Sequence, residues 1–405
     1  MSTLPKLQIN NLTKIFGPRS KLRLALRAFQ DGANRDILQT QLGCVLAVAN
    51  VSLHLDRGEL LVIMGLPGAG KSTLLRCLNR LVEPTRGQVL LDGDDLLQAT
   101  VPQLREVRRK KLAMVFQQCA LLPHCTVVEN VEYGLKVQGM RPNLRREKAL
   151  ETLENMGLSQ WANCLPSALS GARQRRVGLA RALATDAEIL LMDEAFSALD
   201  PLVRREMQRE LLRLQDSLHR TIVFVSQDIQ EALRLGDRVV ILKDGAVEQV
   251  GTPEDIVLNP MSEHVEALIR EVNRAQVLKT GSIARRFPPL VQGQQRLGEV
   301  LALLEAMPSS GADRGSYVVD GEGYPVGYVT RSALRSIAQT TALESRQWEG
   351  AVVARFPQIA DHASLEASFP LCGWGLPVAV VDRSGRLQGV LEPLEILAHL
   401  GKGAG

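Results

Sequence analysis

Residues 65–72 have the types and the spacing that bind phosphate groups. They read GLPGAGKS, follow the apolar run 60–64 and precede a helix-like stretch at 73–78. Glycines let the backbone curl so that its N–H groups and a helix N-terminus can point at phosphate oxygens. Lys71 would reach the β- and γ-phosphates, and Ser72 would be a ligand of Mg²⁺. The segment predicts an ATP-type nucleotide site, against the alternative of a glycine-rich turn before an amphipathic helix. The residues expected to contact the nucleotide are Gly65, Leu66, Pro67, Gly68, Ala69, Gly70, Lys71, Ser72 and Thr73.

A second segment carries the carboxylates that such a site needs. The apolar run 189–192 ends in Asp193 and Glu194, as a buried parallel strand does when it delivers side chains to its C-terminal edge. Asp193 is placed to hold Mg²⁺, and Glu194 can orient a water for attack on the γ-phosphorus. An apolar run that ends in acids is usually only a strand end. Beside a phosphate loop, however, the pair predicts hydrolysis of the nucleotide.

Two further segments resemble those of the ATP-binding cassette (ABC) ATPases. They are LSGARQRRVGLARAL at 169–183 and SALD at 197–200, and the resemblance covers roughly residues 7–260. It implies that Ser170 and Gly171 bind the γ-phosphate held by another copy of the chain, so that a homodimer encloses two ATP molecules. Asp200, which ends the second segment, is expected at the same nucleotide site.

The resemblance also implies roles for two residues outside these segments. Gln117 follows the strand-like run 112–116 and matches the glutamine that contacts Mg²⁺ and the attacking water, next to the transmembrane partner. Its neighbour Gln118 is the weaker candidate. Phe16 matches the aromatic residue that stacks on adenine, although an aromatic side chain after a short apolar run is more often part of a core.

Two positions depart from the family pattern, and both concern the γ-phosphate. Ala172 stands where the signature usually has a second glycine, and its methyl group would crowd the phosphate. Gln227 follows the apolar run 222–225 where the family has a histidine, and a glutamine amide can still donate a hydrogen bond. Losing such a donor outright costs about 3 kcal/mol of transition-state stabilisation. The alternative function is therefore an ATP-dependent dimerisation switch with little turnover.

Composition and charge argue against several other classes of protein. No apolar run approaches the length of about 18 residues that spans a bilayer, and the N-terminal residues have no signal-peptide pattern. The six cysteines, Cys119 among them, have no metal-ligand spacing, which argues for reduced thiols and against zinc. A net charge of +4 without a basic tail argues against nucleic-acid binding. We therefore expect a cytoplasmic location.

A basic insert narrows the resemblance. Residues 18–43 lie where an ordinary ABC domain has a short turn, and they read as mostly helical. With REVRRKKLAMVFQ at 105–117 and LLMDEAFSALDPL at 190–202, they make the chain similar to the ATPase subunits of glycine betaine, proline betaine and choline importers. This similarity implies an integral-membrane permease, a substrate-binding protein that acts through the permease, and a peripheral position on the cytoplasmic face of the inner membrane.

The C-terminal part of the chain contains an internal repeat. A set of five residues recurs 62 positions later: Val318, Val319, Asp320, Gly323 and Gly327 return as Val380, Val381, Asp382, Gly385 and Gly389. Each copy reads as strand, glycine turn, strand and helix, and the pair resembles tandem cystathionine β-synthase (CBS) modules. The implied role is regulatory, and the alternative is a pair that only dimerises the chains.

These segments together predict the fold class and the domains. We expect an α/β P-loop nucleotide-binding domain of the ABC type at 1–275, with a mixed sheet as its core and a helical subdomain. A smaller α+β domain of tandem CBS type, at 276–405, should follow it.

Overall fold

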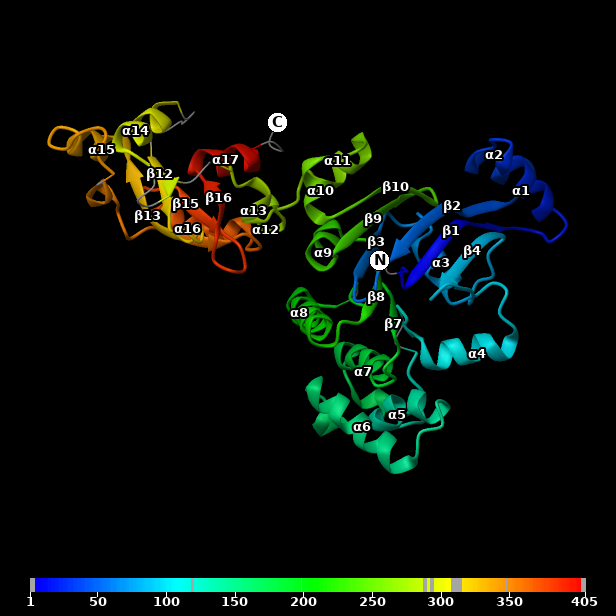
Figure 1. The fold of residues 1–405 in the computed structure, drawn as a ribbon. Coiled ribbons are helices and arrows are strands. Elements are labelled where there is room, and N and C mark those ends of the chain that lie inside the picture. Colours follow the sequence, from blue (N-terminus) through cyan, green and yellow to red (C-terminus); the bar gives the residue numbers. More distant parts are fainter. Residues whose placement is uncertain are drawn as a thin grey trace. The chain divides into compact units, whose positions relative to one another are not determined.

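The computed structural model describes residues 4–117, 120–197, 199–286, 290–291, 295–306, 315–346 and 348–401. Gln118, Cys119 and Ala198 lie outside these residues. The chain divides into two compact units, 1–268 and 269–405, and each is described by itself (Figure 1). The sequence placed a domain boundary seven residues further on, within α12 (Arg274–Val277), whereas α12 lies wholly in the second unit.

The centre of the first unit is a six-stranded sheet with the strand order β10-β9-β3-β8-β7-β6. Its strands are parallel except β10, which pairs antiparallel with β9. The runs that form β3, β7 and β8 are fully buried and mostly apolar, with polar residues only at strand ends, as expected for parallel strands covered on both faces. The bounds are β3 (Leu60–Met64), β6 (Leu112–Val115), β7 (Ile189–Asp193), β8 (Thr221–Ser226), β9 (Arg238–Lys243) and β10 (Ala246–Gly251). The strand predicted at 112–116 ends one residue earlier, so Phe116 belongs to the loop.

A second, antiparallel sheet with the order β2-β1-β4-β5 packs on the first. Its strands are β1 (Leu7–Phe16), β2 (Val45–Leu55), β4 (Arg86–Leu91) and β5 (Asp94–Asp95). The helix α3 (Lys71–Leu78) lies between the sheets, and one apolar cluster includes residues of both sheets and of α3. The core of the first unit thus lies directly beneath the loop that joins β3 to α3.

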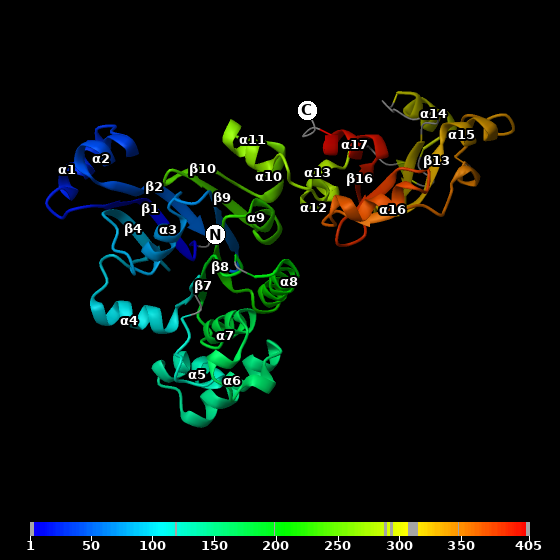
Figure 2. The same cartoon turned by 180° about the vertical axis from the view of Figure 1, so that it is seen from behind.

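The insert between β1 and β2 is helical, as predicted. It forms α1 (Leu22–Gln30) and α2 (Arg35–Leu42), which begins with the side chain of Asn34 as its N-cap and ends with Gly43 in the left-handed conformation. Both helices lie at the end of the β1–β2 pair, far from α5 and α6 in both views (Figures 1 and 2).

The remaining helices of the first unit form a subdomain and a set that covers the main sheet. The subdomain contains α5 (Val127–Val137), α6 (Pro142–Asn155) and α7 (Gly171–Leu183), which contact one another. The others are α4 (Val101–Lys110), α8 (Pro201–Leu218), α9 (Ile229–Leu235), α10 (Pro253–Leu258) and α11 (Glu263–Ile269), of which the last residue of α11 falls in the second unit. In the part of the chain that the structure describes, no helix has the length and apolarity to cross a bilayer.

The second unit contains two three-stranded sheets with the same pairing. In one, β11 (Leu290–Val291) pairs parallel with β12 (Gly315–Val319), and β12 pairs antiparallel with β13 (Pro325–Thr330). In the other, β14 (Gln358–Ala360), β15 (Val378–Val381) and β16 (Leu387–Leu391) repeat this pattern. The pairs Val318–Gly327 and Val380–Gly389 occupy equivalent positions, each followed by a register shift, so the predicted repeat is present in the fold. The helices of this unit are α12, α13 (Thr280–Ile283), α14 (Leu297–Ala306), α15 (Arg331–Ile337), α16 (Phe369–Cys372) and α17 (Pro393–Gly401).

Candidate nucleotide site

The loop between β3 and α3 has the shape that the sequence predicted. Gly68 and Gly70 adopt φ values of +83° and +93°, which L side chains rarely adopt. A Cβ at Gly70 would lie 2.0 Å from the carbonyl oxygen of Ala47 on β2, so only glycine fits there. The tight curvature of the loop therefore requires these glycines. The next residue, Lys71, is the first of α3.

Lys71 is the buried cation of this loop. Its side chain is 4% exposed, and its Nζ donates to the carbonyl oxygen of Leu66 at 3.0 Å. Burial lowers the pKa of Lys71 from its usual value, while the charges of Glu194 and Asp193 act in the opposite direction. A buried ammonium group beside turned backbone N–H groups is suited to a polyanion.

Asp193, at the end of β7, lies against the first turn of α3. Its Oδ1 accepts a hydrogen bond from the Ser72 hydroxyl at 2.7 Å, and its Oδ2 accepts one from Arg76 at 3.1 Å. Ser72 and Arg76 are four residues apart and therefore lie on one face of the helix. The carboxylate and the hydroxyl form a cluster of hard oxygen atoms, which is the donor set that Mg²⁺ prefers.

Glu194 lies between two glutamine side chains. Nε2 of Gln117 donates to its Oε2 at 3.0 Å, and Nε2 of Gln227 donates to its Oε1 at 2.5 Å. Nζ of Lys71 is 3.9 Å from Oε1. Glu194 has φ +46°, an uncommon conformation for a residue with a side chain. The structure thus brings Gln117, Gln227 and Lys71, which are far apart in the sequence, to one carboxylate.

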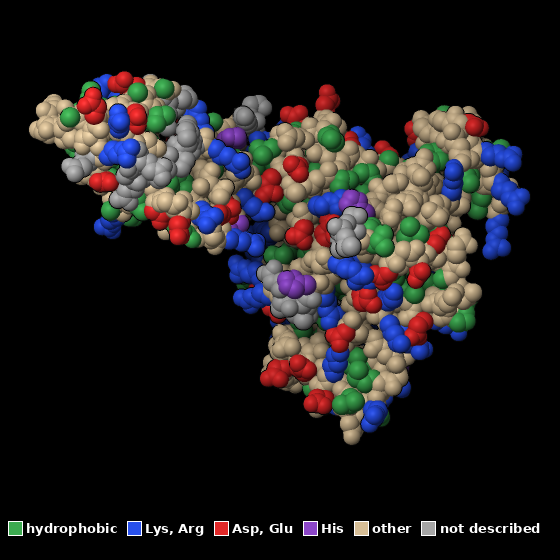
Figure 3. Space-filling view, viewed as in Figure 1, with side chains coloured by type: hydrophobic (Ala, Val, Ile, Leu, Met, Phe, Trp, Pro, Cys, Tyr) green, Lys and Arg blue, Asp and Glu red, His purple; other side chains and the backbone are tan. Residues whose placement is uncertain are grey.

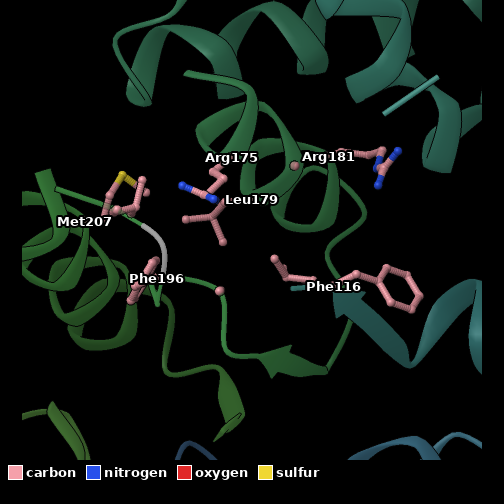
Figure 4. Close-up of a pocket in the computed structure, with 10 residues that line it drawn as sticks. Phe116, Arg175, Leu179, Arg181, Phe196 and Met207 are labelled. Atoms are coloured by element: carbon pink, nitrogen blue, oxygen red, sulfur yellow. The ribbon is translucent and has the colours of Figure 1, made fainter. Parts of the chain in front are cut away.

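A narrow pocket, lined mostly by apolar side chains, lies next to the residues that follow Glu194 in the sequence. Figure 4 shows Leu179 and Arg175 of α7 near Phe196 and Met207, with Phe116 at the other end. The pocket joins the loop that carries Gln117, the helix α7 and the segment that follows Glu194. Arg181 of α7 also donates to the carbonyl oxygen of Ala120 at 3.0 Å. Helix α7 is therefore bonded to Ala120, close in the sequence to Gln117.

The segment after Glu194 is fixed by local hydrogen bonds. The Ser197 hydroxyl donates to the carbonyl oxygen of Glu194 at 3.0 Å, and Asp200 caps α8 by accepting from the N–H of Leu202 at 2.9 Å. Arg204 of α8 donates to the carbonyl oxygen of Ser197 at 3.0 Å, and its Nη1 lies 3.6 Å from the carboxylate of Asp228. Arg204 therefore links this segment to the one that carries Gln227.

The signature residues lie at the start of α7. Ser170 is its N-cap residue in extended conformation, and both Ser170 and Gly171 are exposed. Gln174 holds the preceding turn by donating to the carbonyl oxygens of Pro166 and Leu169. The Arg173 guanidinium lies 4.0 Å from the ring centroid of Trp161, so it is engaged within its own subdomain.

Phe16, at the end of β1, is 42% exposed and is not part of a core. The ammonium group of Lys14 lies 4.7 Å from the centroid of its ring. This exposure excludes the interpretation of Phe16 as a core residue, and its role in stacking on adenine stays a prediction.

Sequence reasoning missed Arg76 and Arg204. Arg76 could have been found from its spacing, because a helix that starts at Lys71 places residues 72 and 76 on the same face. Arg204 has no such signal, because its contacts depend on how α8 packs beside the loop at 226–228.

The fold and the site define an ATP-binding cassette, and comparisons with known proteins agree. Residues 48–197 match the family described as ABC transporter. The glycine betaine/proline betaine transport system ATP-binding protein ProV of Escherichia coli K12 is 46% identical over 399 residues, which are 98% of this chain and 97% of ProV. The glycine betaine transport ATP-binding protein OpuAA of Bacillus subtilis is 41% identical, over 95% of this chain and 90% of OpuAA.

A solved structure is similar to part of the chain. The dimeric, post-hydrolysis ATP-binding cassette MJ0796, bound to ADP and Pi, has a TM-score of 0.52 and is 34% identical. The match covers 61% of this chain and 98% of that cassette. The chain belongs to the family of ABC transporter ATP-binding proteins, and its nearly full-length relatives are those of glycine betaine transport systems.

Proposed function

We infer that this chain is the ATP-hydrolysing subunit of an importer for glycine betaine, proline betaine or choline-type osmoprotectants. One observation carries the hydrolytic function: the Glu194 carboxylate lies 3.9 Å from Lys71 and is held by the amides of Gln117 and Gln227. The class of solute comes from the names of relatives that match nearly the whole chain.

The site residues divide the chemistry among them. The loop at 65–73 and Lys71 hold the phosphates of ATP, and Phe16 stacks on the adenine. Glu194 orients a water for attack on the γ-phosphorus, and Gln117 and Gln227 fix the carboxylate in place. The bond to the β-phosphate oxygen breaks, so ADP and phosphate leave.

A magnesium ion fits beside this carboxylate. Ser72 and Asp193 supply oxygen atoms that already lie 2.7 Å apart, and Gln117 lies at the neighbouring carboxylate. When bound, the ion would neutralise charge on the β- and γ-phosphates.

The working form of the protein is a homodimer on a membrane permease. Ser170 and Gly171 are exposed at the N-terminus of α7, where they can meet the γ-phosphate held by a second copy, and Asp200 lies in the segment next to it. A permease is implied by the transport systems named among the relatives. A substrate-binding protein would deliver the solute, and the ATPase would lie on the cytoplasmic face of the membrane.

The alternative, a switch with little turnover, has less support. It rests on Ala172 and Gln227 as departures from the family pattern. Gln227 nevertheless keeps an amide donor at the site, and this donor binds the Glu194 carboxylate at 2.5 Å.

We propose that the second unit is a regulatory pair of CBS-type modules. The duplicated strand pairing and the helix after each copy, α15 and α17, support this interpretation.

Two substitutions separate ATP binding from hydrolysis. In the complex with the permease, Lys71→Ala should abolish ATP binding, because it removes the buried cation. Glu194→Gln should keep ATP binding, lower hydrolysis at least about a hundredfold and trap an ATP-bound dimer, because only the carboxylate is lost. Phosphate release and size-exclusion chromatography with ATP and Mg²⁺ measure these effects. Glu206→Gln, in an exposed ion pair with Arg176, is the matched control. A Glu194→Gln protein that hydrolyses ATP normally would contradict the proposal.

A further inference from the structure

The insert at α1 and α2 has no part in the chemistry described above. Its apolar side chains, with Ala25 and Leu38 at the centre, pack on Ile15 near the end of β1 and on Leu46 near the start of β2. Four of its basic side chains, those of Arg19, Lys21, Arg23 and Arg27, are exposed, and Lys and Arg gather where Figure 1 places these helices (Figure 3). The insert is therefore attached to the sheet by its apolar face.

The insert lies beside both ends of the nucleotide site. On the adenine side, Ile15 of its apolar cluster is the neighbour of Phe16, and a Cβ at Gly17 would lie 2.6 Å from Sγ of Cys44. On the phosphate side, Arg35 is the first residue of α2, and its direction is set because Asn34 caps the helix by accepting from the N–H of Ile37 at 2.9 Å.

Arg35 contacts the phosphate loop itself. Its Nη1 lies 3.1 Å from Oδ1 of Asp244 and 3.4 Å from the carbonyl oxygen of Gly68. Asp244 belongs to the turn between β9 and β10, and the next residue, Gly245, donates its N–H to the carbonyl oxygen of Ala69 at 3.1 Å. The carbonyl oxygen of Gly245 in turn accepts a hydrogen bond from the N–H of Ala49 on β2, at 2.8 Å. The loop is thus supported from outside by a turn, and Arg35 joins the insert to both.

We propose that Arg35 is a positioning residue through which the insert sets the geometry of the phosphate loop and hence the affinity for ATP. This proposal rests on the function proposed for the loop. The carbonyl oxygen of Gly68 accepts a hydrogen bond from the Arg35 guanidinium, so the contact restrains the backbone of the loop. Glu194 has no part in this contact, so substrate binding should change and the chemical step should not.

The size of the effect follows from the exposure of the pair. The side chains of Arg35 and Asp244 are 32% and 68% exposed, so solvent screens their attraction. Pairs of this kind change an equilibrium about two- to fivefold. Arg35→Ala should therefore raise the KM for ATP about threefold and leave kcat within a factor of two. Arg35→Lys keeps the charge but replaces the planar guanidinium, whose Nη1 lies near both acceptors, with an ammonium group, so it should lie between these values.

A double-mutant cycle tests the route through Asp244. In the complete complex, ATP hydrolysis and equilibrium binding of ADP are measured for Arg35→Ala, Asp244→Asn and the double variant. If Arg35 acts through Asp244, the double variant should be no weaker than Arg35→Ala alone. Arg27→Ala, an exposed arginine of the same insert, is the control and should match the unmodified protein.

Two outcomes would overturn the proposal. One is an unchanged KM and ADP affinity in Arg35→Ala, whether or not its melting temperature falls, because the residue would then serve folding alone. The other is a fall in kcat with KM unchanged. Failure of the proposed function is distinguishable, because it would appear as normal ATP binding in Lys71→Ala, whatever Arg35→Ala does.

Discussion

Strands that end in a carboxylate occur in both units, and the partners of that carboxylate differ. At the end of β7, Asp193 and Glu194 contact side chains that lie 33 to 123 residues away in the sequence. At the ends of β12 and β15, Asp320 and Asp382 accept hydrogen bonds from backbone N–H groups two and four residues further on. The first arrangement gathers distant segments, and the second closes a tight turn.

The difference separates a site from a piece of scaffold. Asx turns form wherever a short carboxylate meets its own following N–H groups, so they need no other part of the fold. Convergence of Lys71, Gln117 and Gln227 on Glu194 requires four separate elements to be in place. A repeated aspartate in a strand–turn–strand unit is therefore evidence for architecture, whereas long-range partners of a buried carboxylate are evidence for chemistry.

Two glycines with the same φ value would show this difference most strongly. Gly70 and Gly323 both have φ +93°. A Cβ at Gly70 would meet the Ala47 carbonyl oxygen at 2.0 Å, whereas at Gly323 the nearest atom is 3.9 Å away, in Arg386. Gly70→Ala should lower the affinity for ATP at least about a hundredfold, because the loop must shift. Gly323→Ala should cost about 1 kcal/mol of stability in the second unit. Binding of a fluorescent ATP analogue and thermal unfolding measure the two effects.

The comparison would fail if Gly70→Ala bound the analogue with an affinity within threefold of the unmodified protein. It would also fail if Gly323→Ala weakened nucleotide binding, because the turn at 320–324 would then not be merely scaffold.

The sequence predicted those parts of the site that local patterns encode. The loop at 65–72 and the acids at the end of β7 follow from spacing within short segments, the repeat follows from identical spacing in two copies, and the fold confirms their elements. Arg35, Arg204 and the two amides on Glu194 depend on packing between distant elements. No periodicity in the sequence encodes which loop lies beside α2 or α8, so these contacts could not be derived from it.

The substitution Gln227→His tests whether the amide at this position limits turnover. Gln227 donates a neutral hydrogen bond to Glu194. A histidine, which is the usual residue in the family, can instead contact the γ-phosphate and should raise the ATPase rate about tenfold with little change in ATP affinity. Steady-state kinetics of the complete complex measure both quantities. A lower or unchanged rate would mean that the amides of Gln117 and Gln227 together support hydrolysis in this chain. The hydrogen bonds to Glu194, and not a histidine at position 227, would then define the site.

The smallest expected effect concerns acid sensitivity, and it compares a carboxylate held by a turn with one held by charges. Hydrogen bonds from the Ser384 hydroxyl and the Arg386 N–H lower the pKa of Asp382 to about 2. For Asp92, burial raises the pKa, but hydrogen bonds from Lys111 and Lys6 outweigh it and lower the pKa to about 2. Because both pKa values lie below the ordinary value of about 3.9, each contribution is complete above that pH and is lost as pH falls towards 2.

Segment-resolved hydrogen exchange between pH 5 and pH 2.5 measures these contributions, with Asp382→Asn and Asp92→Asn compared with the unmodified protein. Asp382→Asn should change the protection of 378–391 only slightly, because an asparagine oxygen accepts the same N–H groups, and salt should not matter. Asp92→Asn should weaken the protection of 86–91 more, and less so at 1 M salt, because its partners Lys6, Arg57 and Lys111 are cations. Equal salt dependence at Asp92 and Asp382 would mean that the turn of the second unit also depends on distant charges. Asp382 could then not be classed as a residue that serves only a local turn.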